Sequence, residues 1–216
     1  MRWPPSVAGE RGGAPASNRR LDTPPKEGGY SARTELSVRS YSMPILRYLK
    51  VLATTSTAHL FHYSTFLVAE VDGVPAAALC GYFDDELGYA AVSAVGDEVD
   101  RQTGRDAAAG EAGLARIAPF VAVLPEHEPH AWVIENVATL PAFRRRGLVD
   151  RLLLEIIDRG VKRGATSIDI GVLIGNDPAQ RAYEKVGFRV VGEKRNAELE
   201  AVWGTPGIRA LSYIVK

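Results

Sequence analysis

From residue 131 onward, strand-like segments alternate with helix-like segments, and this alternation restricts the fold more than any other feature. Residues 131–139 and 166–174 have the alternating, β-branched pattern of strands. Between them, residues 144–163 place large aliphatic side chains on one helical face and paired charges on the other, and Gly164 follows as a stop signal. Strands that alternate with helices pack in layers around one sheet. The sequence therefore predicts an α/β (α+β) fold with a mixed central sheet flanked by helices.

The segments before residue 131 fit the same fold. Asp72-Gly73 separates two strand-like runs and predicts a β-hairpin, because glycine readily takes positive φ. Residues 34–41 alternate weakly and predict a first strand, and residues 44–62 have the apolar spacing of a helix. Residues 84–130 are acidic and rich in alanine and glycine, and there we expect one or two helices and an irregular connection.

The last segments predict one helix and two strands. Asp177 is the expected N-cap of the helix, with Gln180 completing a capping-box-like pair, and Gly187 is expected to end it. Residues 188–196 and 207–216 have strand-like patterns and are expected to complete the sheet.

Residues 1–34 differ in composition from the rest of the chain. They are rich in proline and glycine and contain almost no large aliphatic side chains, so they cannot bury enough apolar surface to offset the entropy of ordering. We expect a flexible N-terminal tail over residues 1–34 and one domain over residues 35–216. The basic side chains of the tail are interpreted as solvated, and a functional basic arm is the alternative.

Composition excludes several classes of protein. The 26 basic and 26 acidic side chains balance, which argues against a dedicated nucleic-acid partner. The single cysteine, Cys80, excludes an intramolecular disulfide and a multi-cysteine zinc site, and it is expected to be a buried apolar residue. No apolar run reaches the roughly 18–20 residues of a membrane helix, and the first residues lack a secretory signal. We expect a soluble, cytoplasmic protein with no membrane partner.

The junction between residues 137 and 149 indicates an anion site. Here a strand runs into Arg144, Arg145 and Arg146, and Gly147 then opens the long helix. Unpaired N–H groups and the helix dipole favour phosphate at a helix N-terminus, arginines add charged donors, and glycine lets a ligand approach the backbone. The physical interpretation is a pyrophosphate cradle, and the alternative is a solvated basic turn. The glycine-rich patterns of P-loops and dinucleotide folds are absent.

A second motif, Asn176-x-x-Ala179-x-x-x-Tyr183 followed by Gly187-Phe188, comes after the next strand. Together the two motifs resemble the GNAT acyltransferase superfamily, whose signature is V-x-P-x-x-R-x-x-G-x-G/A followed by N…A…Y-x-x-x-G-F. The resemblance covers residues 131–190 well and residues 35–216 more loosely. It implies the acyl-CoA N-acyltransferase fold, with a mixed sheet of about six to seven strands, and makes a homodimer plausible.

Two positions depart from the family pattern. Thr139 replaces valine and has nearly the same shape. Val149 stands where the family has glycine or alanine, and its β-branched side chain is expected to crowd the pyrophosphate.

The resemblance also implies a coenzyme A site. The backbone of the 137–139 strand would pair with the pantetheine arm as an added strand, and the 144–149 turn would hold the pyrophosphate through main-chain N–H groups. Asn176 would lie beside the pantetheine, and its alternative role is a plain cap. The expected cofactor-binding residues are Val137, Ala138, Thr139, Arg144, Arg145, Arg146, Gly147, Leu148, Val149 and Asn176.

Acetyl transfer from a thioester to an amine requires a base, an oxyanion donor and an acid. Tyr183 matches the family position for the acid, and a core aromatic is its alternative role. Glu135 is our candidate base, because it is charged within a strand-like run directly before the expected cofactor contacts. A solvated or ion-paired carboxylate is the alternative. The oxyanion donor is expected to be a backbone N–H of the 137–139 strand.

The cluster before this strand holds the weaker catalytic candidates, which are Glu126, His127, Glu128 and His130. Its spacing matches no metal-ligand pattern, so we expect no metal. His59 and His62 are expected to be structural, and Cys80 is not expected to be a nucleophile, because nothing in the sequence places a base beside it.

The sequence therefore predicts an N-acetyltransferase that uses acetyl-CoA as co-substrate and transfers acetyl directly, in a ternary complex, to a primary amine of a small molecule or peptide. The acidic residues 84–86, Glu126 and Glu128 fit a cationic acceptor, and a solvated loop explains them equally well. The first alternative is a non-catalytic acyl-CoA-binding sensor or interaction module. Two others are a longer acyl donor and a nucleic-acid-binding module that uses Arg144–Arg146.

Overall fold

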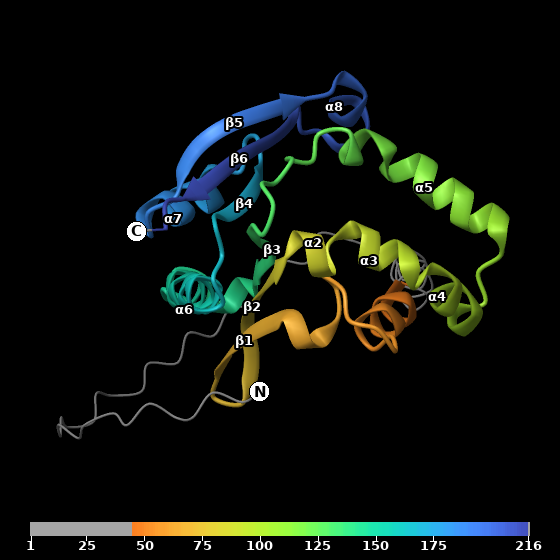
Figure 1. Ribbon diagram of the computed structural model, residues 1–216, viewed down its shortest axis with the longest axis horizontal. Helices are drawn as coiled ribbons and strands as arrows, with labels where there is room; N and C mark the ends of the chain where they lie inside the picture. The colour runs from red at the N-terminus through yellow and green to blue at the C-terminus, as the bar shows by residue number, and fades with distance from the viewer. Residues whose placement is uncertain (1–44, 216) are drawn as a thin grey trace, which may run out of the picture.

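The computed structural model describes residues 45–215. Their strands form one six-stranded mixed sheet in the order β1-β2-β3-β4-β6-β5, in which only β3 and β4 pair in parallel (Figure 1). This confirms the predicted fold class. The strands are β1 (Phe66–Val71), β2 (Val74–Phe83), β3 (Trp132–Thr139), β4 (Ile168–Leu173), β5 (Arg189–Arg195) and β6 (Gly207–Tyr213).

Helices lie on both faces of the sheet (Figure 1). They are a helix over residues 45–53, α2 (Asp84–Leu87), α3 (Tyr89–Ala94), α4 (Gly96–Thr103), α5 (Ala107–Val121), α6 (Leu148–Lys162), α7 (Asp177–Lys185) and α8 (Ala197–Trp203), with short 3-10 turns η1 (Tyr63–Thr65) and η2 (Pro141–Phe143). Within residues 45–215, none is long and apolar enough to cross a membrane.

The two faces of the sheet carry separate cores. On one face, Trp132 and Ile134 of β3 pack with α6 and with Tyr183 of α7 in the main core. On the other face, Val133 packs with Leu60 and Tyr82. Because side chains alternate along a strand, Glu135 belongs to the same face as Val133. The far half of this second face is covered by the end of α5 and by α8, through a cluster of Val123, Leu199 and Ile208.

The predicted hairpin is confirmed. Asp72 and Gly73 join β1 to β2 with φ of 52° and 77°, which is the pattern of a two-residue turn with both central residues left-handed. Its twist matches that of the flanking strands, and this explains why the Asp-Gly pair was informative.

Several predicted boundaries were wrong. The helix expected over residues 44–62 ends at residue 53, where the Thr54 hydroxyl donates to the carbonyl of Lys50 and Thr55 donates to that of Thr57. Threonine side chains that bond to the backbone in this way compete with helix continuation. Residues 84–130 contain four helices rather than one or two. The strand expected at 34–41 and the tail at 1–34 lie outside the described residues.

Three further corrections concern the C-terminal half. α6 begins at Leu148 rather than at residue 144, because residues 141–147 form a 3-10 turn and a loop. α8 was not predicted. Asn176, rather than Asp177, is the N-cap of α7, and its side chain accepts a hydrogen bond from the Ala179 N–H at 3.4 Å. Asparagine and aspartate are nearly equal as N-caps, so the sequence did not distinguish between them.

The sheet separates in the middle. β3 and β4 pair only from Trp132 opposite Ile168 to Ile134 opposite Ile170. Beyond these pairs β3 continues along β2, with a register shift opposite Ala78 and Cys80 and a positive φ of 55° at Asn136, which together mark a β-bulge. β4 continues along β6. The two strands therefore diverge and leave an opening between them.

Candidate functional site

A cleft of about 400 Å³ lies at the opening between β3 and β4. Four predicted site residues line it: Glu135 and Val137 from β3, Asn176 at the start of α7, and Tyr183 within α7. Glu135 comes from the face of Val133, and Tyr183 packs in the core of the α6 face. The separation of the strands thus lets side chains from opposite faces of the sheet meet in one cleft.

Glu135 is mostly buried beside β2. Burial raises the pKa of its carboxyl above the ordinary glutamate value, because the charged form loses its hydration. The Tyr82 hydroxyl, the His127 imidazole and the Tyr89 hydroxyl stabilise the anion and limit this rise, whereas Asp84 adds to it. A carboxylate with a raised pKa is a better proton acceptor than an exposed one.

Tyr183 is 5 % exposed and packs edge-on against Phe188 with ring centroids 6.4 Å apart. Burial raises the pKa of its hydroxyl to about 12, so the group keeps its proton at neutral pH. Its predicted role as an acid requires a protonated hydroxyl at the cleft, and Tyr183 is among the residues that line the cleft. Its alternative role as a core aromatic is also visible, because the ring belongs to the main core.

His127 was a minor candidate in the sequence, but it lines the cleft. Its Nδ1 lies 3.1 Å from Oδ2 of Asp169 on β4, and the Ser167 hydroxyl contacts the same carboxylate oxygen at 3.4 Å. Burial alone would lower the pKa of His127, but the hydrogen bond and charge of Asp169, with smaller contributions from Asp84 and Glu135, outweigh it and raise the pKa. Asp169 was missed, although a charge within a strand-like run was the signal used for Glu135.

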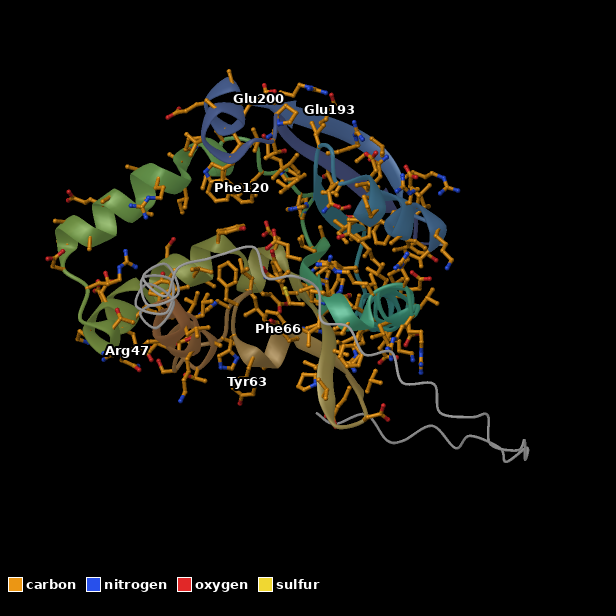
Figure 2. The ribbon with its side chains drawn as sticks, turned by 180° about the vertical axis from the view of Figure 1, so that it is seen from behind. Arg47, Tyr63, Phe66, Phe120, Glu193 and Glu200 are labelled. Carbon is orange, nitrogen blue, oxygen red and sulfur yellow. The ribbon has the colours of Figure 1, made fainter. Side chains whose placement is uncertain are left out.

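The walls of the cleft on the Glu135 face are aromatic and aliphatic. They come from the segment before η1, from α3, and from the end of α5 with the residues that follow it: Phe61, Tyr89, Phe120, Leu124 and Pro125. Phe61 and Tyr89 meet edge to face at 6.4 Å, and Phe120 stacks on Trp203 of α8 at 5.7 Å. Figure 2 shows Phe120 at the end of α5, where this helix meets α8. Sequence analysis identified none of these residues, because they lie far apart in the chain.

The basic turn lies outside the lining of the cleft, at the start of α6. Gly147 is the N-cap residue with φ of 72°, and no side chain caps the first N–H groups of the helix. Arg144, Arg145 and Arg146 are exposed, and none forms an ion pair with any residue in the described range 45–215. The guanidinium of Arg146 lies over the ring of Phe143, 5.0 Å from its centroid. An uncapped helix N-terminus beside arginines that form no ion pair within residues 45–215 suits a phosphate-bearing ligand.

Val149 is half-buried and packs against the main core. Its side chain therefore contributes to the anchoring of α6, and the crowding expected from the sequence remains a prediction. Ala138 and Thr139 pair with β2 on one side, opposite Ala78 and Ala77. Their other edge faces the opening, because β4 has already diverged.

The remaining candidates lie in other surroundings. Glu126 pairs with Lys194 at 2.8 Å, Glu128 is exposed, and His130 stacks on Phe83. Cys80 is fully buried, and burial raises the pKa of its thiol to about 12, which does not suit a nucleophile. In the described part of the chain, no group of three or more potential ligands is placed to hold a metal.

Comparison with known proteins identifies the family. The model described as "Acetyltransferase (GNAT) family" matches residues 35–188. The chain belongs to the GNAT acetyltransferase family. No curated protein matches the chain.

Solved structures share the GNAT fold. One, described only as an acetyltransferase, superposes with a TM-score of 0.53 at 18 % identity, over 84 % of each chain. An N-acetyltransferase from Staphylococcus aureus Mu50 gives 0.51 at 19 % identity, over 83 % of this chain and 94 % of that one. At these identities the likeness concerns the fold alone.

Proposed function

We propose that this GNAT protein transfers an acetyl group from acetyl-CoA to a primary amine by direct transfer in a ternary complex. The observation that carries the proposal is the opening between β3 and β4, which brings Glu135 and Tyr183 into one cleft from opposite faces of the sheet. A base and an acid separated in this way can serve an amine and a leaving thiol that enter from different sides.

The donor would be held by this chain's own backbone and basic turn. The uncapped N–H groups at the start of α6, with Arg144, Arg145 and Arg146, fit the pyrophosphate of coenzyme A. The free edge of Val137–Thr139 fits an extended pantetheine arm that pairs as a strand does. When bound, the thioester supplies the activated acetyl group.

The proton transfers that the reaction requires define one role for Glu135 and one for Tyr183. A primary alkylamine is protonated at neutral pH, with a pKa near ~10, so it must lose a proton before it attacks. Glu135 accepts that proton, directly or through water. The C–N bond then forms, the C–S bond breaks, and Tyr183 donates its proton to the departing sulfur. The new amide nitrogen releases its remaining extra proton, which restores the Tyr183 hydroxyl directly or through water. A backbone N–H on the free edge of β3 supports the oxyanion.

The proposal is tested by calorimetric and thermal-shift titrations with acetyl-CoA, CoA and ATP, followed by assay of CoA thiol release with amines. We expect binding of acetyl-CoA and CoA without ATP, and a stabilisation of about 2.7 kcal/mol at 100 times Kd. Reversing the charge of Arg145 and Arg146 is expected to weaken CoA binding at least tenfold, whereas the same change at Arg116 on the exposed side of α5 is the control.

Two results would contradict the proposal. Absence of acetyl-CoA binding would remove the donor site. Binding without thiol release for any amine would leave the acyl-CoA-binding module as the function.

A further inference from the structure

The side of the cleft that carries Glu135 has an unusual combination of walls and charge. Its walls are the rings of Phe61, Tyr89 and Phe120, with Leu124 and Pro125 beside them. Among the described residues that line the cleft, Glu135 is the only carboxylate, and no lysine or arginine is present. His127 is the only other side chain with a strongly basic or acidic group among these lining residues, and its Nδ1 lies 3.1 Å from Oδ2 of Asp169.

This side is the one left for the acceptor. The basic turn and α6 belong to the opposite face of the sheet, where Leu148 and Leu152 of α6 pack in the main core with Tyr183. If the donor occupies that face and the free edge of β3, the second substrate must approach from the face of Glu135. The assignment of the acceptor therefore rests on the proposed function.

Charge complementarity limits the acceptor to one ammonium group. One buried carboxylate can neutralise one such group, and burying further cations without partners is costly. Polyamines would bring unpaired charges to apolar walls. An α-amino acid would bring a carboxylate close to Glu135, where like charges repel.

Aromatic walls favour an aromatic body on that amine. Phe61 and Tyr89 already meet edge to face, and a third ring between them and Phe120 would add offset or edge contacts of the kind that aromatic pairs prefer. Rings also attract an ammonium group that passes over their faces. We propose that this side of the cleft binds a primary arylalkylamine with a single positive charge, its ammonium at Glu135 and its ring between Phe61, Tyr89 and Phe120.

Gly171 makes room for such a ring. It lies on β4, lines the cleft, and has no Cβ; an added Cβ would come within 3.4 Å of Cγ2 of Ile208. A larger side chain there would occupy the space of the acceptor without touching the basic turn. Gly192 on the exposed strand β5 has nothing within 4 Å of its added Cβ and is a matched control.

The first experiment measures amine binding without acetyl-CoA, by calorimetry with phenethylamine, phenylalanine and spermidine as probes. Phenethylamine is expected to bind at least tenfold more tightly than the other two. Glu135→Gln, Phe61→Ala and Gly171→Val are each expected to weaken it about tenfold or more. Gly192→Val and Tyr63→Ala, which alters an exposed ring outside the cleft, are expected to leave its Kd unchanged.

The second experiment measures CoA thiol release with the same three amines. The expected order of kcat/KM follows the order of binding, and Gly171→Val lowers kcat/KM for phenethylamine without changing the Kd for acetyl-CoA. Tighter binding or faster turnover of phenylalanine or spermidine would overturn this inference, as would the absence of binding by all three probes. Binding of phenethylamine to a chain that fails to bind acetyl-CoA would keep the amine site and overturn the proposed acetyl transfer instead.

Discussion

Glu135 is in surroundings that oppose its charge, and this has a consequence for stability as well as for chemistry. Its pKa is raised by burial, so the native state binds the proton more tightly than the unfolded chain does. The native state is therefore most favoured below the ordinary glutamate pKa, and stability is lost as pH rises through the raised value. Above that raised value the full cost of the buried charge is present.

Glu135→Gln is accordingly expected to lower kcat by about 10²–10⁴-fold while raising the free energy of unfolding at pH 7. The gain in stability should shrink as the pH approaches 4, because both chains then carry a neutral side chain at this position. Urea denaturation across pH, together with a pH–rate profile, measures both effects. A variant that is less stable than the parent at pH 7 would indicate that the carboxylate is structural.

Tyr183→Phe separates the two roles of this ring. The substitution keeps the aromatic packing with Phe188 and removes only the hydroxyl, so the core is expected to tolerate it. We expect kcat to fall with little change in the Kd for CoA, as removal of an interaction made only in the transition state requires. Unchanged turnover would leave Tyr183 as a core residue and nothing more.

Asp169→Asn tests the pairing with His127. The carboxylate raises the pKa of His127, so the protonated imidazole stabilises the native state. That contribution is complete below the ordinary histidine pKa and is lost as pH rises through the raised value. The variant is therefore expected to lose more stability at pH 5.5 than at pH 8.5, and the His127 resonance in NMR should titrate at a lower pH. An unchanged titration would contradict the pairing.

At the scale of the element, α6 depends on close contact with β3. Gly160 faces Trp132, and an added Cβ would lie 2.7 Å from Cγ of the indole. Two neighbours restrict the indole: Arg163 lies over its ring, and Phe83 meets it edge to face. The absence of a side chain at Gly160 thus sets the distance between helix and sheet.

Gly160→Ala is expected to destabilise the protein by about 1–3 kcal/mol through overpacking, although alanine is the better helix former. Gly110→Ala in α5 is the control, because its added Cβ has only ordinary contacts and the variant should gain up to about 1 kcal/mol. Equilibrium denaturation in urea measures both. Equal changes in the free energy of unfolding for the two variants would show that Trp132 can move aside without destabilising the protein.

The elements also show what a sequence can reveal about this fold. The hairpin at Asp72-Gly73 and the long helix α6 were predicted, because each is encoded by neighbours in the chain. Only one or two of the four helices of residues 84–121 were expected, since the first three are short and their alanine- and glycine-rich sequence has weak periodicity. The N-cap of α7 was misplaced by one residue, because two good caps are adjacent.

At the scale of the whole molecule, some residues of the site were predicted from the sequence and others were not, as for the elements. Asn176 and Tyr183 were predicted because they lie within a motif, and Glu135 because it is a charge within a strand-like run. The structure places all three around one cleft. The aromatic walls and the pair His127–Asp169 were not, because Phe61, Phe120 and Asp169 meet only when distant segments pack together. Their functional roles, like those of Glu135 and Tyr183, remain to be tested by the experiments above.

The short pairing of β3 with β4 has a mechanical consequence. Only three residue pairs, from Trp132–Ile168 to Ile134–Ile170, join the two halves of the sheet. We expect this junction to act as a hinge, so that rotation about it changes the width of the cleft. A pantetheine arm paired with Val137–Thr139 would brace the hinge. Slower hydrogen exchange of edge amides in this segment on CoA binding, with β1 unchanged, would reveal such bracing, and equal exchange would exclude it. The junction at which the substrate binds would then link binding to the relative orientation of the two halves of the sheet.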